Sequence, residues 1–236
     1  MKPKGSKKAS TEGFECRFCG KHLAREVGLL RHLCRNKKRY FEREGRDVYF
    51  GYMAYRIFYQ IAYPSRTTPV SPEHFRKSSV YDAFVRFGKY VMDVNAIAPE
   101  EFIRYAVQSK LGVDKWCSDA LYREYVRNLN KVEDSDRAVE RTLLLAESWS
   151  VKEGKRVQDF FREIAPAHAV QWLVSGRISP WVIFNSESGK KLLDRFSDEQ
   201  FDLLQDAIDM KFWKKKFMDN IEECHRIQDF LTSEGI

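Results

Sequence analysis

Apolar side chains recur at helical spacing along most of this chain, and strict alternation of apolar and polar residues is nearly absent. Between residues 48 and 62, apolar and aromatic side chains fall on more than one face of a helix, which predicts a helix that is largely buried. Further segments with helical periodicity cover residues 79–93, 118–131, 136–149, 156–164, 167–174, 210–219 and 221–232. The pattern therefore predicts a mainly α protein whose sheet is limited to a short hairpin near the N-terminus.

Helix start signals support this interpretation. Ser71 and Ser179 each precede a proline, an arrangement typical of a capping residue followed by the first helical position. Residues 197–200 (SDEQ) match a capping box in front of an apolar stretch. Another helix is expected to begin at Pro99, which is followed by two glutamates.

The pattern divides the chain into four expected parts. Residues 1–13 (MKPKGSKKASTEG) have almost nothing apolar to offset the entropy of ordering, so they are predicted to form a disordered basic tail. Residues 14–38 carry a metal-binding pattern. The polar turn at 131–136 then divides the remainder into helical domains at residues 39–132 and 133–236.

Composition narrows the class of protein. With 43% hydrophobic and 14% aromatic residues, most of the chain is expected to fold. No apolar run approaches the ~18 residues of a membrane span, and the basic N-terminus is not followed by the apolar stretch of a secretory signal. Five cysteines in no paired framework indicate a reducing compartment, and Cys117 and Cys224 are expected to be packing residues. We expect a soluble, cytoplasmic protein with no membrane partner.

The net charge of +7 is unevenly distributed. Residues 1–46 contain seven Lys and seven Arg against five Glu, a net charge of +9, so the other 190 residues sum to −2. A cationic segment on a nearly neutral body is typical of a nucleic-acid contact, because neutralised phosphates release counterions. A basic tail that merely aids solubility is the alternative interpretation.

A metal-binding pattern lies within this basic segment, at residues 14–32 (FECRFCGKHLAREVGLLRH). Cys16, Cys19 and His32 have the spacing C-x2-C-x12-H, in which a knuckle presents two thiolates and a helix presents an imidazole to zinc. Three apolar residues occupy the positions that form the small core of such a unit: Phe14, Leu23 and Leu29. Zinc is therefore the expected cofactor.

The fourth ligand departs from the usual pattern, which places His or Cys about three to five residues after the first histidine. Cys34 follows His32 by two residues, about 200° around an α-helix, so its side chain points away unless the helix ends or tightens at His32. His22 is the alternative protein ligand, although its place beside the knuckle favours a solvent-facing side chain, and another group could also complete the tetrahedron. The expected ligands are Cys16, Cys19, His32 and Cys34.

Residues 14–38 resemble the Cys/His zinc-finger family of ββα units. The resemblance implies a helix that can enter the DNA major groove, with base contacts from Arg25, Gly28 and Arg31. Glycine reads no base and one finger spans only about three base pairs, so weak sequence specificity is expected. The expected DNA-binding residues are Lys21, Arg25, Arg31, Arg35, Lys37, Lys38, Arg39 and Arg43. A finger that contacts protein, and a single-strand platform formed by the tyrosines of residues 40–63, are alternatives.

Residues 47–218 are similar, in the order of several segments, to the helicase-loading protein of T4-type bacteriophages. The matching segments include VYDAFVRFGKYV, DKWCSDALYREYVRNL and GRISPWVIFNSESGKKLL. This resemblance implies a two-domain, all-helical, non-enzymatic protein that binds forked DNA and brings the replicative helicase onto it. It assigns no individual site residues, and it places a phage-encoded protein in the host cytoplasm.

No catalytic motif is evident. Residues 186–191 (SESGKK) lack the upstream glycine and the Ser or Thr of a phosphate-binding loop, so no nucleotide cofactor is expected. The leading hypothesis is a zinc-finger DNA-binding accessory protein for replication or recombination, acting in fork binding or helicase loading with a protein partner such as a helicase. The alternatives are a transcription-associated adaptor that binds DNA and RNA polymerase, and a nuclease or DNA-modifying enzyme with an unrecognised site.

Overall fold

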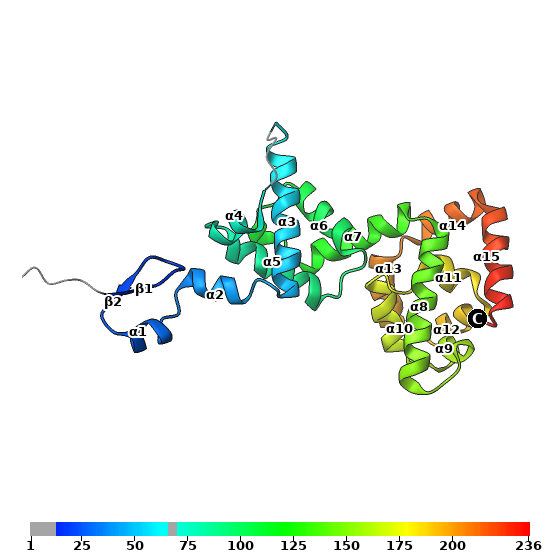
Figure 1. Ribbon diagram of the computed structural model, residues 1–236. Coiled ribbons are helices and arrows are strands. Elements are labelled where there is room, and N and C mark those ends of the chain that lie inside the picture. Colours follow the sequence, from blue (N-terminus) through cyan, green and yellow to red (C-terminus); the bar gives the residue numbers. More distant parts are fainter. Residues whose placement is uncertain (1–12, 66–69) are drawn as a thin grey trace, which may run out of the picture. The chain divides into compact units, whose positions relative to one another are not determined.

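The computed structural model describes residues 13–65 and 70–236, apart from the side chains of residues 206 and 207 (Figure 1). These residues form a mainly α fold with one two-stranded sheet, as the apolar periodicity predicts. The predicted tail at residues 1–13 lies outside the described residues, except for Gly13. Within the described residues, every helix is too short or too polar to cross a membrane.

The chain forms two compact units. The first contains the described residues up to Asn95 together with Val107–Cys117, and the second contains Ala96–Ala106 and Ser118–Ile236. The elements of the first unit are β1 Phe14–Glu15, β2 His22–Leu23, α1 Glu26–Arg31, α2 Arg35–Phe41, α3 Arg46–Ala62, α4 Pro72–Lys77, α5 Tyr81–Asp93 and the 3-10 helix η1 Val113–Lys115. Those of the second unit are α6 Pro99–Gln108 (its last two residues excepted), α7 Asp119–Val132, α8 Ser135–Glu153, the 3-10 helix η2 Val157–Asp159, α9 Phe160–Glu163, α10 Pro166–Val174, α11 Pro180–Asn185, α12 Glu187–Leu193, α13 Asp198–Ala207, α14 Met210–Asp219 and α15 Ile221–Ser233.

The unit boundary differs from the one expected at residues 132 and 133. The predicted polar turn does separate α7 from α8, but both helices belong to the second unit. Aromatic packing explains why α7 joins α6, since Phe102 lies 5.1 Å from the ring centroids of both Tyr122 and Tyr125. Across the turn, Glu133 pairs with Arg141 of α8, so the two helices are also joined electrostatically.

The first unit is built around close contact between α3 and α5. A Cβ at Gly51 of α3 would lie 2.8 Å from the carbonyl oxygen of Phe84, and a Cβ at Gly88 of α5 would overlap the carbonyl oxygen of Asp47. Glycine at both positions therefore allows the two backbones to touch. Beside this crossing, Tyr55, Phe84 and Phe87 are fully buried in an aromatic core. The expectation of a buried aromatic helix is met on one side of α3, whereas its Tyr49 is 59% exposed.

The second unit has a larger apolar core. The central helix α11 buries Trp181, Val182 and Ile183, and Trp181 makes an edge contact with Trp213 of α14 at a centroid distance of 5.7 Å. The start signals form as predicted: Ser71 and Ser179 cap α4 and α11, and Ser197 and Gln200 form the capping box of α13. Local sequence therefore determines where these helices begin, and burial of large side chains stabilises their packing.

Candidate metal centre

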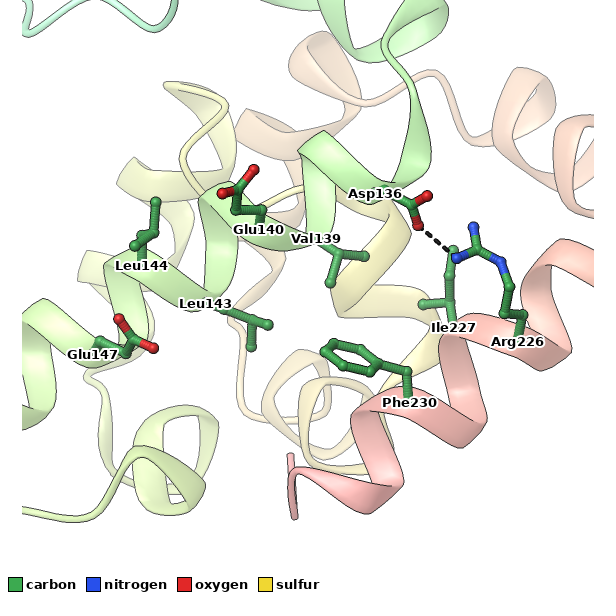
Figure 2. A pocket seen from close by; sticks show the side chains of 9 residues that line it. All are labelled: Asp136, Val139, Glu140, Leu143, Leu144, Glu147, Arg226, Ile227 and Phe230. Atoms are coloured by element: carbon green, nitrogen blue, oxygen red, sulfur yellow. Dashed lines mark hydrogen bonds and ion pairs between the residues drawn. The ribbon is translucent and has the colours of Figure 1, made fainter.

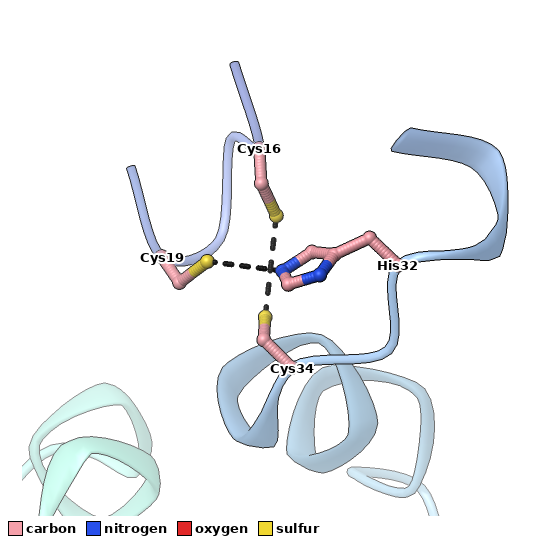
Figure 3. Close-up of side chains that lie close together, drawn as sticks. All are labelled: Cys16, Cys19, His32 and Cys34. Atoms are coloured by element: carbon pink, nitrogen blue, oxygen red, sulfur yellow. Dashed lines mark hydrogen bonds between the residues drawn. The ribbon is translucent and has the colours of Figure 1, made fainter. Parts of the chain in front are cut away.

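Four side chains near the N-terminus converge on one point (Figure 3). The donor atoms of Cys16, Cys19, His32 and Cys34 all lie within 4.8 Å of one another. The Cys16 and Cys34 sulfurs are 4.0 Å apart, and the Cys19 sulfur is 3.3 Å from Nε2 of His32. The structure therefore brings together the four residues that the spacing predicted, and this group can hold a metal ion.

The distances and the donor types fit zinc. A tetrahedral zinc ion with ordinary bond lengths places its sulfur ligands about 3.8 Å apart and a sulfur and a nitrogen about 3.6 Å apart. The two distances above, 4.0 Å and 3.3 Å, lie close to these values. Three thiolates and one imidazole form a closed Cys3His set, which is typical of structural zinc sites. A zinc ion held by these residues would link the knuckle, α1 and α2.

The cysteine knuckle is shaped by backbone hydrogen bonds. The N–H groups of Cys19 and Gly20 donate to the carbonyl oxygen of Cys16, at 3.2 Å and 2.8 Å. Gly20 has a φ of +71°, a left-handed conformation that glycine adopts without the steric penalty of a side chain. The hairpin pairs Phe14 with Leu23 just outside this turn. The knuckle therefore positions the first two thiols through local geometry alone.

The position of Cys34 depends on a break in the helix. Helix α1 ends at Arg31, and His32 has φ −68° and ψ 114°, an extended conformation. Cys34 is also extended and serves as the N-cap of α2, with its sulfur accepting from the backbone N–H of Lys37 at 3.3 Å. The expected helix end at His32 is thus confirmed. It turns the Cys34 sulfur back toward the other ligands.

His22 lies outside the cluster. It is exposed on β2, and its Nε2 lies 4.0 Å from a carboxylate oxygen of Glu15. The structure therefore places Cys34, and not His22, beside the other three donor groups. Cys117 and Cys224 are also separate: burial raises the pKa of both thiols, and the Cys224 thiol contacts the carbonyl oxygen of Phe217 at 3.8 Å. Both behave as packing residues, as expected.

The surroundings of Cys16 and Cys19 shift the pKa values of these two thiols in opposite directions. Desolvation raises the pKa of Cys16, but hydrogen bonds from the backbone of Phe18 and Cys19 and from neighbouring thiols outweigh it and lower this pKa below its ordinary value. The backbone of Lys21 lowers the pKa of Cys19, but desolvation and hydrogen bonds with the other thiols raise it overall. A divalent cation favours the thiolate at each position, so metal binding releases protons and weakens as the pH falls.

Four of the predicted DNA-binding cations lie close to the cluster residues in the sequence and are accessible. Lys21, Arg25, Arg31 and Arg35 are exposed, and none has an acidic partner at ion-pair distance in the part of the chain that the structure describes. Arg31 and Arg35 are the chain neighbours of ligands His32 and Cys34. A zinc ion with three thiolates and a neutral imidazole has a net charge of −1, and Glu15 and Glu26 are also exposed. With the five cations from Arg17 to Arg35, the segment has a net charge of +2.

The other four predicted cations have partners in the protein. Lys37 Nζ lies 3.4 Å from the carbonyl oxygen of Leu30, Lys38 pairs with Glu42 at 3.8 Å, and Arg43 pairs with Glu44 at 3.0 Å. The Lys38 pair is accessible to solvent, so exchange for phosphate costs little. Arg43 is half-buried and also donates to the carbonyl oxygen of Tyr40 at 2.8 Å. These three residues are therefore weaker candidates for nucleic-acid contacts than the four cations without partners.

Arg39 differs from the sequence-based expectation because it is only 4% exposed. Its guanidinium donates to the carbonyl oxygens of Arg76 and Ser78, at 2.8 Å and 3.0 Å, and to Asp82 at 3.0 Å. It also lies 4.2 Å from the Tyr81 ring centroid. Arg39 anchors α2 to the turn between α4 and α5, so it is unsuited to a direct phosphate contact. The burial of Arg39 could not be predicted from the sequence, because the groups that accept its hydrogen bonds lie far along the chain.

The second unit contains a groove between α8 and α15, with a volume of about 570 Å³ (Figure 2). Its apolar lining consists of Val139, Leu143, Leu144, Ile227 and Phe230. Three carboxylates and one guanidinium line its edges, and the guanidinium of Arg226 already pairs with Asp136 at 2.6 Å. Glu140 and Glu147 have no basic partner among the described residues, so the groove has a net negative charge.

Comparison with known proteins gives no family for this chain: no protein-family model, curated protein or solved structure matches it. The resemblance to phage helicase-loading proteins thus stays a prediction.

Proposed function

We propose that this protein is a nucleic-acid-binding accessory protein whose zinc finger contacts DNA, and that it acts in replication or recombination, at a fork or in helicase loading. The observation that carries the proposal is the set of four exposed cations near the Cys3His cluster that have no acidic partner among the described residues. Phosphate neutralisation by such cations supplies most of the affinity of non-specific DNA binding. We infer no catalytic activity.

Weak sequence specificity follows from the finger itself. Helix α1 has six residues, and Gly28 lies between the two candidate base-reading arginines, Arg25 at the N-cap and Arg31 in the last turn. A single finger reads about three base pairs, too few for a unique site. We propose that the finger recognises DNA mainly through its phosphates and that specificity comes from DNA structure and from a protein partner.

The decisive experiment measures DNA binding at several salt concentrations. The double variant Arg31→Gln, Arg35→Gln removes two cations beside the metal ligands without altering a ligand. We expect the slope of log affinity against log salt on duplex DNA to fall by about 1.8, because each lost phosphate contact removes about 0.9. Fork, duplex and single-stranded DNA are compared, and a fork preference is expected of the wild type.

The matched control is the double variant Arg123→Gln, Arg137→Gln, which removes two exposed arginines from α7 and α8 and changes the net charge equally. It should leave the salt slope unchanged. An equal loss in both variants means that affinity follows total charge and not the finger, and the proposal then fails.

A protein partner is expected to use the groove of the second unit. Its apolar lining and carboxylate edges suit a cationic amphipathic helix, which would bury its apolar face and pair its Lys or Arg side chains with Glu140 and Glu147. A synthetic helical peptide with leucines on one face and lysines on the other serves as the probe. The Glu140→Lys, Glu147→Lys variant should bind it at least about tenfold more weakly, whereas Glu124→Lys, Asp202→Lys should not.

A specific observation favours a second candidate function, the transcription-associated adaptor. Val27, Leu30 and Leu33 are 55%, 71% and 69% exposed on and just after α1, and a finger that contacts protein uses such apolar side chains. Direct binding to RNA polymerase that is lost in Leu30→Gln, with DNA affinity unchanged, favours the adaptor. Stimulated loading of a replicative helicase on forked DNA favours the leading proposal.

A further inference from the structure

A hollow of about 490 Å³ lies in the first unit, where the cysteine knuckle approaches α2 and α4. Arg17 and Phe18 line it from the knuckle, Tyr40 from α2, and Arg76 from α4. Its volume falls within the range of sites for small organic ligands. Residues of α1, the helix that a finger presents to duplex DNA, do not contribute to it. The hollow is therefore a separate candidate site.

The hollow has an excess of positive charge. Lys77 pairs with Glu73 at 2.8 Å, and the hydrogen bond from Lys77 lowers the pKa of the Glu73 carboxyl, so these two charges offset each other. Arg17 and Arg76 have no carboxylate at ion-pair distance in the described part of the chain. The net charge of the lining is +2, which favours an anionic ligand.

Aromatic rings lie beside these charges. The ring centroids of Phe18 and Tyr40 are 5.1 Å apart, and the Arg17 guanidinium lies 4.8 Å from the Phe18 centroid. Bases that are not paired in a duplex stack on aromatic rings and on guanidinium planes. Rings next to guanidinium groups therefore match a ligand that combines a flat aromatic base with a phosphate.

Hydrogen bonds hold the walls of the hollow in place. The Asn36 amide donates to the carbonyl oxygen of Phe18 at 2.8 Å, which joins α2 to the knuckle. The buried Arg39 joins the same helix to the backbone of Arg76. The remaining N–H and the oxygen of the Asn36 amide are the groups that can recognise the edge of a base.

We propose that this hollow binds one unpaired nucleotide of a single-stranded nucleic acid, with its base against Phe18 and Tyr40 and its phosphate on Arg17 and Arg76. The inference rests on the proposed function in so far as the ligand is nucleic acid, but it assigns the contact to a different surface. Cations around the metal cluster bind the duplex phosphates, and the hollow takes a base where the duplex ends. This arrangement gives the protein a physical basis for preferring a fork to a duplex.

The test compares an oligothymidine strand with a fully paired duplex of the same length, using the full chain loaded with zinc. Tyr40→Leu should weaken binding to the single strand about tenfold, because stacking on one aromatic side chain is worth about that factor or more per base. Duplex affinity should change less than twofold. Tyr40→Phe keeps the ring and should restore single-strand binding.

Further measurements distinguish a folding defect from a lost contact. Native mass spectrometry should show one zinc ion in every variant, and Arg76→Gln should reproduce the single-strand loss without altering an aromatic ring. Tyr49→Leu is the matched control, because Tyr49 is an exposed tyrosine of α3 outside the hollow. An oligonucleotide carrying 5-iodouracil should crosslink to Phe18 or Tyr40, as mapped by peptide mass spectrometry.

The outcomes separate this inference from the proposed function. Equal weakening of duplex and single-strand binding by Tyr40→Leu, with zinc retained, overturns the nucleotide site. Unchanged single-strand binding in Tyr40→Leu and Arg76→Gln also overturns it, and the proposed function survives if Arg31→Gln, Arg35→Gln still loses duplex affinity. A wild-type protein that binds no nucleic acid refutes both.

Discussion

The finger and the second unit are stabilised by different means. In the described finger, residues 13–34, Cys16 is the only buried apolar side chain, and Phe14, predicted to form its core, is 41% exposed. The second unit instead buries a continuous set of large side chains that includes Phe160, Trp181 and Trp213. Below about 40 residues a chain seldom buries enough apolar surface to fold by itself. We therefore expect a metal ion to supply the folding free energy of the finger.

The finger and the second unit also differ in the charge that they present to solvent. A segment without an apolar core can present most of its side chains to solvent, and the finger presents cations. The second unit uses its apolar residues for packing and leaves a groove edged by carboxylates. One region is thus suited to polyanions and the other to cationic protein segments. Each of the following predictions tests whether the finger depends on metal while the helical units depend on burial.

The largest effect is expected from Cys34→Ser. Loss of one of four ligands should lower zinc affinity at least about 100-fold, since even outer-shell partners of metal ligands are worth about 10- to 100-fold. Competition with a chromogenic chelator measures the change. The control is Cys117→Ser, a cysteine outside the cluster, which should retain zinc. Full zinc affinity in Cys34→Ser would falsify the Cys3His assignment.

A substitution in the core of the second unit should affect its stability and not zinc binding. Trp213→Ala removes a side chain that is 2% exposed and should lower the free energy of unfolding of this unit by about 3–5 kcal/mol. Urea denaturation monitored by far-UV circular dichroism measures this loss. Zinc affinity should stay unchanged. Val151→Ala, at an 85% exposed position, is the control and should cost less than about 0.5 kcal/mol.

Arg39→Met tests the connection of α2 to the rest of the first unit. The variant leaves the carbonyl oxygens of Arg76 and Ser78 without their charged donor, and we expect a loss of about 2–3 kcal/mol. Thermal unfolding should show this loss, and zinc should be retained at low temperature. Arg43→Met is the control, because Arg43 is more exposed and pairs at the surface with Glu44. An equal loss in both variants contradicts the anchoring role of Arg39.

The smallest effect is expected from Ser197→Ala in the capping box of α13. Removing this cap should lower the stability of the second unit by about 1 kcal/mol and leave zinc affinity and DNA binding unchanged. Denaturant titration beside the wild type measures the difference. Ser148→Ala, an exposed change inside α8 away from both of its caps, should be nearly neutral. A change in the zinc affinity of Ser197→Ala would argue that the finger and the second unit are not stabilised independently of each other.

Local patterns in the sequence determined most of the secondary structure and the candidate metal ligands. The capping serines, the helical periodicity and the spacing of Cys16, Cys19 and His32 each act over a few residues, so their outcomes follow from backbone geometry and side-chain chemistry nearby. Even the helix end at His32 could be anticipated, because Cys34 cannot face the other ligands from an unbroken helix.

Tertiary structure alone decided the features that join distant segments. The burial of Arg39 depends on carbonyl groups about forty positions away in the chain, and the hollow beside Tyr40 requires α4 to lie near the knuckle. The grouping of α6 with α7 likewise results from aromatic contacts between helices. A sequence pattern records which side chains are available, but long-range packing selects which of them meet, and that selection is a property of the whole fold.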